Sequence, residues 1–159
     1  MSEHIPVLLY EVIDGLNIKE NGIYVDCTLG RGGHSTVILS KLGRVGKLIG
    51  IDQDEEAINE CEKKFSKKSK SITIVRDNFV NLSQILKKEG TTKVDGILLD
   101  LGVSSPQFDE SERGFSYRYD APLDMRMDQR NLLTAKDIVN NYREKDLINI
   151  FKEIGRASC

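Results

Sequence analysis

Four short apolar segments of this sequence end at an aspartate or lead directly into one. The four residues are Asp26, Asp52, Asp77 and Asp100. Ligands of parallel sheets bind outside the carboxyl ends of the strands, so we expect these carboxylates to line one crevice. Unrelated turns and helix caps would supply the same residue type, but four strand ends in succession favour a common site.

A glycine-rich turn follows the first of these aspartates. It contains Gly30, Gly32 and Gly33, and a helix is expected to begin near His34. Residues without a side chain let the backbone approach a bound nucleotide closely, and a helix start favours negative groups. We therefore expect an adenosine-like ligand here, although tight α/β turns need glycine in any case. His34 can contact that ligand, or it can simply begin the helix.

The next two strand ends carry groups that suit a nucleoside. Asp52 stands where a carboxylate accepts hydrogen bonds from two ribose hydroxyls. Asp77 and Asn78 offer polar atoms to the edge of adenine, and Phe79 offers a ring to its face. The turn lacks the dehydrogenase glycine spacing and the P-loop lysine, and Asp26 can hold a cationic amino-acid group. The pattern favours S-adenosylmethionine over NAD or ATP.

Alternating strands and helices must position these residues. Apolar runs predict buried strands, and apolar residues at helical spacing predict helices between them. The expected strands cover residues 22–27, 48–52, 72–75 and 94–100, and the expected helices cover residues 7–16, 35–42, 55–65 and 81–88. Such alternation implies a Rossmann-like α/β fold, with a parallel sheet covered by helices on both faces.

A long segment without clear periodicity follows the fourth strand, and helical spacing returns from Thr134. Loops of this length in compact domains are usually functional or disordered. Guanidinium groups and aromatic rings are mixed in it, and they suit the phosphates and unstacked bases of RNA. The residues expected on the RNA side are Arg113, Phe115, Tyr117, Arg118 and Arg126. The alternative is a loop packed onto its domain, with its arginines in internal ion pairs.

The sequence therefore divides into three segments. We expect a cofactor-binding half-domain over residues 1–108, a substrate-side loop over residues 109–133, and the start of a helical insertion over residues 134–159. Doubly wound sheets commonly have about five strands or more, so the four strands predict an incomplete sheet and an interrupted protein. The fourth strand would then be an exposed edge, which predicts a homodimer or aggregation.

Composition limits the class of protein. Charged residues make up 30% of the 159 residues and hydrophobic residues 39%, and neither a secretion signal nor a membrane-spanning run is visible. We therefore expect a soluble cytoplasmic protein. Three cysteines without a C-x-x-C pair and two histidines predict neither disulfides nor a metal site. The net charge of −2 lacks the basic footprint of most nucleic-acid-binding domains.

Several motifs taken together resemble one known family. They are HIPVLL at 4–9, DCTLGRGGHS at 26–35, IDQD at 51–54, DNF at 77–79, DLGVSSPQ at 100–107, RGFS at 113–116 and PLDMRM at 122–127. Over nearly the whole chain, these segments are similar to the RsmH (MraW) family. Its members are S-adenosylmethionine-dependent methyltransferases that modify the N4 amine of a decoding-centre cytidine in 16S ribosomal RNA.

This resemblance implies a strand order of 3-2-1-4 and roles for particular residues. The residues it places against S-adenosylmethionine are Gly32, Gly33, His34, Asp52, Phe79, Asp100 and Gln107. A cytosine amine is a poor nucleophile, so a site must orient it and accept its N–H groups. The candidates for this catalytic role are Asp100, Ser104 and Ser105, although Asp100 can serve the cofactor alone and the serines can be ordinary loop groups.

Three alternatives to the RNA enzyme remain open. A small-molecule methyltransferase would be insensitive to ribosomal RNA. An inert cofactor-binding module would bind S-adenosylmethionine without transferring its methyl group. A nucleotide-linked oxidoreductase would bind NAD.

Overall fold

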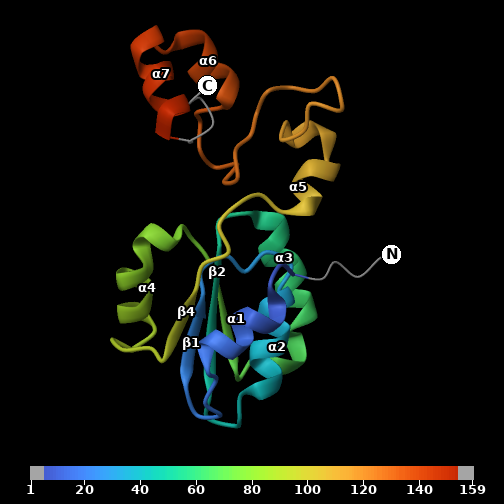
Figure 1. Cartoon of the computed structure of the whole chain (residues 1–159). Helices are drawn as coiled ribbons and strands as arrows, with labels where there is room; N and C mark the ends of the chain where they lie inside the picture. The colour runs from blue at the N-terminus through green and yellow to red at the C-terminus, as the bar shows by residue number, and fades with distance from the viewer. Residues whose placement is uncertain (1–5, 154–159) are drawn as a thin grey trace. The chain divides into compact units, whose positions relative to one another are not determined.

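The structure of the chain is a computed structural model that describes residues 6–153. Residue contacts divide the chain into two compact units, Met1–Gly102 and Val103–Cys159 (Figure 1). The first unit contains a sheet covered by helices, and the second contains short helices joined by a long loop. Within the described residues, no helix is both long enough and apolar enough to cross a membrane.

A four-stranded parallel sheet forms the centre of the first unit. Its strands are β1 (Ile23–Asp26), β2 (Lys47–Asp52), β3 (Ile72–Arg76) and β4 (Gly96–Leu98). They lie in the order β3-β2-β1-β4, with Val25 of β1 paired to Ile49 on one side and to Ile97 on the other. The predicted α/β fold and its strand order are confirmed.

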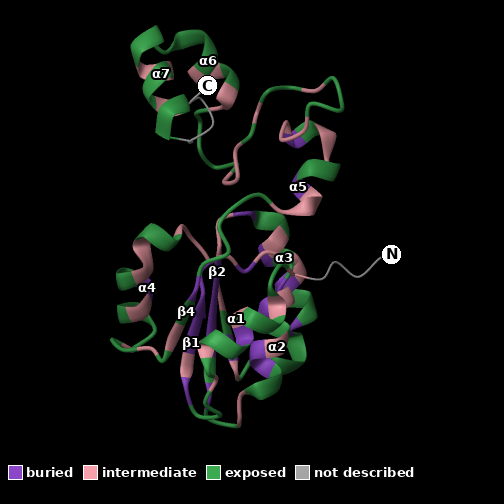
Figure 2. Ribbon diagram, viewed as in Figure 1, coloured by how far each residue is buried: buried purple, intermediate pink, exposed green. Residues whose placement is uncertain are grey.

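Helices cover both faces of this sheet. Three of them, α1 (Leu9–Leu16), α2 (Gly33–Lys41) and α3 (Glu55–Lys64), lie on one face, and α4 (Leu82–Lys88) lies on the other (Figure 1). Successive strand residues point to opposite faces, so Tyr24 packs with Ile38 of α2 whereas Val25 packs with Ile85 of α4. Figure 2 shows β1 and β2 buried between these layers.

The start and end of α3 follow from its sequence. Asp54 precedes the helix, and its Oδ1 accepts the Glu56 N–H at 3.1 Å. Acidic residues fill the first turn and lysines fill the last, which complements the helix dipole. The helix therefore begins at Glu55, where the sequence predicts it.

The fourth strand differs from its prediction. The sequence predicts a buried strand over residues 94–100, but β4 spans only Gly96–Leu98, and Ile97 is 43% exposed. The Asp95 N–H still donates to the Ile23 carbonyl oxygen at 2.7 Å, and the Asp95 carboxylate accepts the Ile23 N–H and the Lys19 ammonium, each at 3.0 Å. Among residues 6–153, β4 pairs only with β1, which leaves its other edge unpaired.

The second unit consists of α5 (Ser105–Asp109), the short 3₁₀ helix η3 (Ser111–Arg113), α6 (Ala135–Asn141) and α7 (Glu144–Glu153). Thr134 caps α6, because its Oγ1 accepts the Asp137 N–H at 3.2 Å and Asp137 Oδ2 in turn accepts the Thr134 N–H at 3.0 Å. The helical spacing predicted from Thr134 is therefore correct. Ile154, the last residue of that pattern, lies outside the described residues.

Candidate functional site

Asp52, at the end of β2, is hydrogen-bonded to the turn that follows β1. Its Oδ2 accepts the Gly30 N–H at 2.7 Å, and its Oδ1 accepts the Asp54 N–H at 2.9 Å. Burial raises the pKa of the Asp52 carboxyl, while these backbone N–H groups act in the opposite direction. A carboxylate oxygen accepts more than one hydrogen bond, so Asp52 can hold the turn and still accept a hydroxyl of a ligand.

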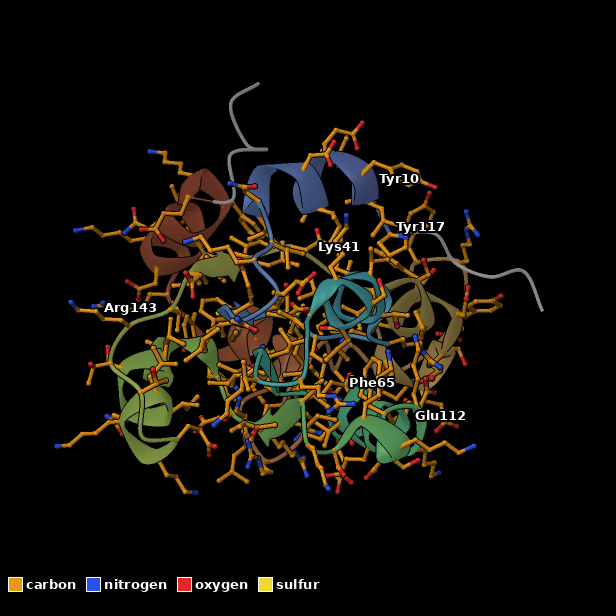
Figure 3. The ribbon with its side chains drawn as sticks, turned by 90° about the horizontal axis from the view of Figure 1, so that it is seen from below. Tyr10, Lys41, Phe65, Glu112, Tyr117 and Arg143 are labelled. Carbon is orange, nitrogen blue, oxygen red and sulfur yellow. The ribbon has the colours of Figure 1, made fainter. Side chains whose placement is uncertain are left out.

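The glycines of this turn have different neighbours. Gly30 and Gly32 have φ of +49° and +71°, a region that favours glycine. A Cβ at Gly30 would meet only the Thr28 carbonyl oxygen, at 3.9 Å, so this residue borders open space. A Cβ at Gly32 would lie 2.7 Å from the ring of Phe65, the residue that follows α3 (Figure 3), and one at Gly33 would collide with Pro6. Gly30 therefore leaves room for a ligand, whereas Gly32 and Gly33 leave room for the protein itself.

Asp26, at the end of β1, organises the same turn from inside. Asp26 is only 1% exposed, and its carboxylate accepts the Ser35 hydroxyl at 2.7 Å and the Thr28 N–H at 3.2 Å. Burial raises the pKa of Asp26, and the Ser35 hydrogen bond partly offsets that rise. With so little exposed surface, Asp26 faces the turn and α2. The sequence-based expectation that it holds a cationic group of a ligand is not supported by this burial.

Asp100, which follows β4, is held by the turn at its backbone, and its carboxylate lies near the start of α2. Its backbone N–H donates to Thr28 Oγ1 at 2.8 Å, and its Oδ2 lies 3.9 Å from His34 Nδ1. The other ring nitrogen of His34 lies 3.1 Å from the Val7 carbonyl oxygen. His34 is buried, while the Asp100 side chain is 42% exposed, so the carboxylate is accessible to a ligand.

The end of β3 joins the end of β2. The Asp77 N–H donates to the Asp52 carbonyl oxygen at 3.0 Å, and the Asn78 side chain donates to Gln53 Oε1 at 3.1 Å. Asp77 Oδ1 accepts the Asn78 N–H at 2.7 Å and the Asn81 side-chain amide at 2.8 Å. Phe79 is 38% exposed, and a ring that is to stack on a base must be accessible.

The carboxyl ends of all four strands are thus linked through hydrogen bonds. The sequence predicted the convergence of Asp52, Asp77 and Asp100 beside Gly30, and the structure brings them to one edge of the sheet. It did not predict the contribution of Thr28. The short Asp26-Cys27-Thr28 spacing was the available signal, because aspartates often accept the N–H two residues later. No group of three or more His, Cys, Asp or Glu residues that could hold a metal occurs in residues 6–153.

Three of the predicted site residues lie in the second unit, at the start of α5. The Ser104 N–H donates to Gln107 Oε1 at 2.9 Å, which caps the helix. Gln107 is buried, and Ser104 and Ser105 are half-buried. The described contacts of Ser104 and Gln107 thus stabilise this helix start.

The predicted RNA-contacting residues divide into two groups. Arg113 is buried and donates to the carbonyl oxygens of Arg126 and Met127 at 3.2 and 3.4 Å, with its guanidinium 6.0 Å from the centre of the half-buried Phe115 ring. Arg126 forms a two-pronged pair with Asp124 at 2.8 and 2.7 Å. These contacts favour the alternative of internal pairing for both arginines.

The other group is exposed. Tyr117, which is labelled in Figure 3, is fully exposed, and the next residue, Arg118, is also exposed. These two side chains of the second unit are therefore accessible to a binding partner.

The sheet order, the parallel strands and the glycine turn define a Rossmann-like α/β protein, a fold in which ligands bind at the carboxyl ends of the strands. A crystal structure from Clostridium thermocellum, provisionally named an rRNA methylase, has the same fold. It aligns with a TM-score of 0.54 and 23% identity over 65% of this chain and 57% of that one.

Sequence comparison is more specific. A model of the MraW methylase family matches residues 1–159, so the chain belongs to the MraW methylase family, as its motifs indicated. The chain is also 61% identical, over 156 residues, to the ribosomal RNA small subunit methyltransferase H of Mesoplasma florum. That alignment covers 98% of this chain and 50% of the relative, so the chain spans about half the relative's length.

Proposed function

We propose that the chain is the cofactor-binding part of an S-adenosylmethionine-dependent methyltransferase that modifies the N4 amine of a decoding-centre cytidine in 16S ribosomal RNA. The observation that carries this proposal is the convergence of Asp52, Asp77 and Asp100 around the Gly30 turn, in a chain of the MraW methylase family. The identity of 61% to a small-subunit methyltransferase supports the choice of RNA.

The chemistry of the crevice fits S-adenosylmethionine. Asp52 accepts the ribose hydroxyls, and Gly30 lets the ligand approach the backbone. Asp77 and Phe79 serve the edge and face of adenine, and Asp100 lies at the methyl-donor end. In this proposal Gly32, Gly33 and His34 shape the turn, and Gln107 is a further cofactor contact.

The reaction requires a site that orients a weakly nucleophilic amine. When bound, S-adenosylmethionine supplies the methyl group. The Asp100 carboxylate accepts an N–H of the cytosine amine and takes up the proton that the amine loses, and Ser104 and Ser105 orient the base. The exposure of the Asp100 carboxylate supports this assignment.

The RNA surface belongs to the loop of the second unit. Tyr117 and Arg118 bind RNA directly, since a ring and a guanidinium group in solvent suit a base and a phosphate. Arg113, Phe115 and Arg126 support the shape of that loop through their internal contacts.

The segments then have distinct roles. Residues 1–108 bind the cofactor, residues 109–133 face the substrate, and residues 134–159 begin a helical insertion. A ribosomal substrate implies a cytoplasmic location.

The unpaired edge of β4 and the exposed Ile97 favour a homodimer of this chain, which light scattering over a range of concentrations tests directly. A monomer at every concentration would contradict the dimer.

The first experiment is a calorimetric titration of the chain with S-adenosylmethionine, with NAD as the comparison ligand. We expect saturable binding of S-adenosylmethionine only, lost in Asp52→Ala and retained in Asp14→Ala, a control on the exposed face of α1. Binding of NAD alone would identify an oxidoreductase. No binding by a folded sample would reject this crevice as a complete cofactor site.

The second experiment measures methyl transfer from labelled S-adenosylmethionine to 30S subunits. Incorporation at a cytidine of 16S RNA supports the proposed function. Binding without incorporation indicates an inert cofactor module, and transfer to small amines without ribosomal RNA indicates a small-molecule enzyme.

A further inference from the structure

We propose that the Thr28 hydroxyl is a positioning group that holds Asp100 in place at the cofactor crevice and thereby sets the affinity for S-adenosylmethionine. The inference rests on the proposed function and adds a residue to its site. It starts from one contact, the hydrogen bond of 2.8 Å from the Asp100 N–H to Thr28 Oγ1.

This contact continues the pairing of β1 and β4 beyond the end of the strand. The Cys27 N–H donates to the Leu98 carbonyl oxygen at 2.9 Å, and β4 ends at Leu98. Two residues later the backbone has left the ladder, and a side chain of the β1–α2 turn accepts its N–H instead. Thr28 therefore fixes the first residues after β4, where Asp100 meets the crevice.

A buried carboxyl group orients the hydroxyl. Because Thr28 Oγ1 accepts from Asp100, its own hydrogen can point to Asp26 Oδ1, which lies 3.5 Å away. Asp26 is anchored in turn by the Ser35 hydroxyl at 2.7 Å and by the Thr28 N–H at 3.2 Å. The chain of contacts runs from the core through Thr28 to the backbone of Asp100, and the Thr28 hydroxyl can both donate and accept in the middle.

The Asp100 carboxylate has a second neighbour at the start of α2, directly after the turn. Its Oδ2 lies 3.9 Å from Nδ1 of the buried His34. Thr28 thus holds the backbone of Asp100, and His34 lies beside its carboxylate. Since the Asp100 side chain is 42% exposed, these contacts order an accessible group instead of filling the core.

The test compares Thr28→Val, which keeps the shape and removes the hydroxyl, with Thr28→Ser, which keeps the hydroxyl. Calorimetry should show affinity for S-adenosylmethionine weakened roughly three- to tenfold in Thr28→Val, as expected for one lost hydrogen bond, and nearly unchanged in Thr28→Ser. Thr91→Val is the matched control, because Thr91 donates to the Lys93 carbonyl oxygen at 2.9 Å on the exposed side of the unit. It should bind like the unsubstituted chain.

A double-substitution cycle shows whether Thr28 acts through Asp100. Once Asp100→Ala has removed the carboxylate, adding Thr28→Val should weaken binding no further. Additive losses, equal losses in Thr28→Ser and Thr28→Val, or full affinity in a folded Thr28→Val would each overturn the proposal.

Amide hydrogen exchange separates this inference from the proposed function. The Asp100 amide should exchange faster in Thr28→Val than in Thr28→Ser, while the amides of β2 keep their protection. If the unsubstituted chain fails to bind S-adenosylmethionine, the proposed cofactor site is wrong. Unchanged exchange at Asp100 would then also reject the positioning role, and faster exchange would retain it.

Discussion

The backbone N–H of Gly30 donates to Asp52 Oδ2 at 2.7 Å, so the turn after β1 is held by the end of β2. The same carboxylate accepts the Asp54 N–H before α3. Asp52 therefore has a structural role that is complete before any ligand arrives, and the proposed ribose contact adds to it. Substitutions at Asp52 must be interpreted with both roles in mind.

Asp52→Ala should lower the free energy of unfolding by about 1–3 kcal/mol, because two backbone N–H groups lose their acceptor in a partly buried place. Asp52→Asn keeps one acceptor oxygen and should lose less. Urea unfolding followed by circular dichroism measures both values. Equal stability of Asp52→Ala and the unsubstituted chain would mean that this contact does not hold the turn.

The stability of the chain should depend on pH through Asp26. Burial raises its pKa above the ordinary value of 3.8, so between 3.8 and the higher folded pKa the native state binds more protons than the unfolded state. The free energy of unfolding therefore falls as pH rises through this window, and the ionised group opposes folding above it. Asp26→Asn removes this contribution and should flatten the slope.

Urea unfolding at a series of pH values from about 4 to 7 measures that slope. Burial also raises the pKa of Asp52, so part of the pH dependence remains in Asp26→Asn. Parallel curves for Asp26→Asn and the unsubstituted chain would show that Asp26 titrates alike in both states.

Gly32→Ala should cost more stability than Gly90→Ala. Both glycines have nearly the same positive φ, +71° and +72°, so the backbone strain of about 1 kcal/mol is common to them. A Cβ at Gly32 lies 2.7 Å from the Phe65 ring, whereas one at Gly90 meets nothing within 4 Å. Overpacking should add about 1–3 kcal/mol at Gly32. Equal losses in chemical unfolding would show that Phe65 moves aside freely.

The internally paired Arg126 and the exposed Arg118 should respond differently to substitution. Arg126→Ala breaks the pair with Asp124 and the 2.6 Å bond to the Asn131 carbonyl oxygen, so the loop should become sensitive to limited proteolysis. Arg118→Ala should leave the proteolysis pattern unchanged and weaken binding to a 16S RNA fragment, in a salt-dependent manner. The reverse pattern would reassign the RNA contact to Arg126.

Two buried cysteines should resist alkylation in the native chain. Burial raises the pKa of the Cys27 thiol to about 11 and that of Cys61 to about 12, so neither is a thiolate at pH 8. Iodoacetamide at that pH, followed by peptide mass spectrometry, should label them only after denaturation. Rapid labelling of Cys61 would mean that α3 opens away from the Gly30 carbonyl oxygen, its neighbour at 3.2 Å.

The sheet and its crevice could be predicted because their signals are local. Apolar runs that end at Asp26 or Asp52 mark buried strands, and the alternation with helices dictates parallel pairing. The contacts of Asp95 at the start of β4 could not be predicted, because Lys19 and Ile23 lie more than 70 residues earlier in the chain. An apolar pattern also cannot show that one face of a strand remains uncovered.

Residue types alone could not separate the two groups of loop residues. Arg113 and Arg118 stand five positions apart in the same mixture of arginine and aromatic residues. The difference arises from carbonyl oxygens of residues 126 and 127, which reach Arg113 only after the loop has folded back. The sequence therefore showed that the loop carries arginine and aromatic residues suited to RNA, and the structure shows which of them reach solvent.

The strand order has a consequence for synthesis on the ribosome. β1 pairs with β2 on one side and with β4 on the other, and β4 is the last of the four strands to be synthesised. The contact between Thr28 and Asp100 spans 72 positions. At translation rates of about 5 to 20 residues per second, the nascent β1 therefore waits roughly 4 to 14 seconds with one edge open. A slow codon before residue 96 would prolong the time for which β1 offers an unpaired edge to other chains.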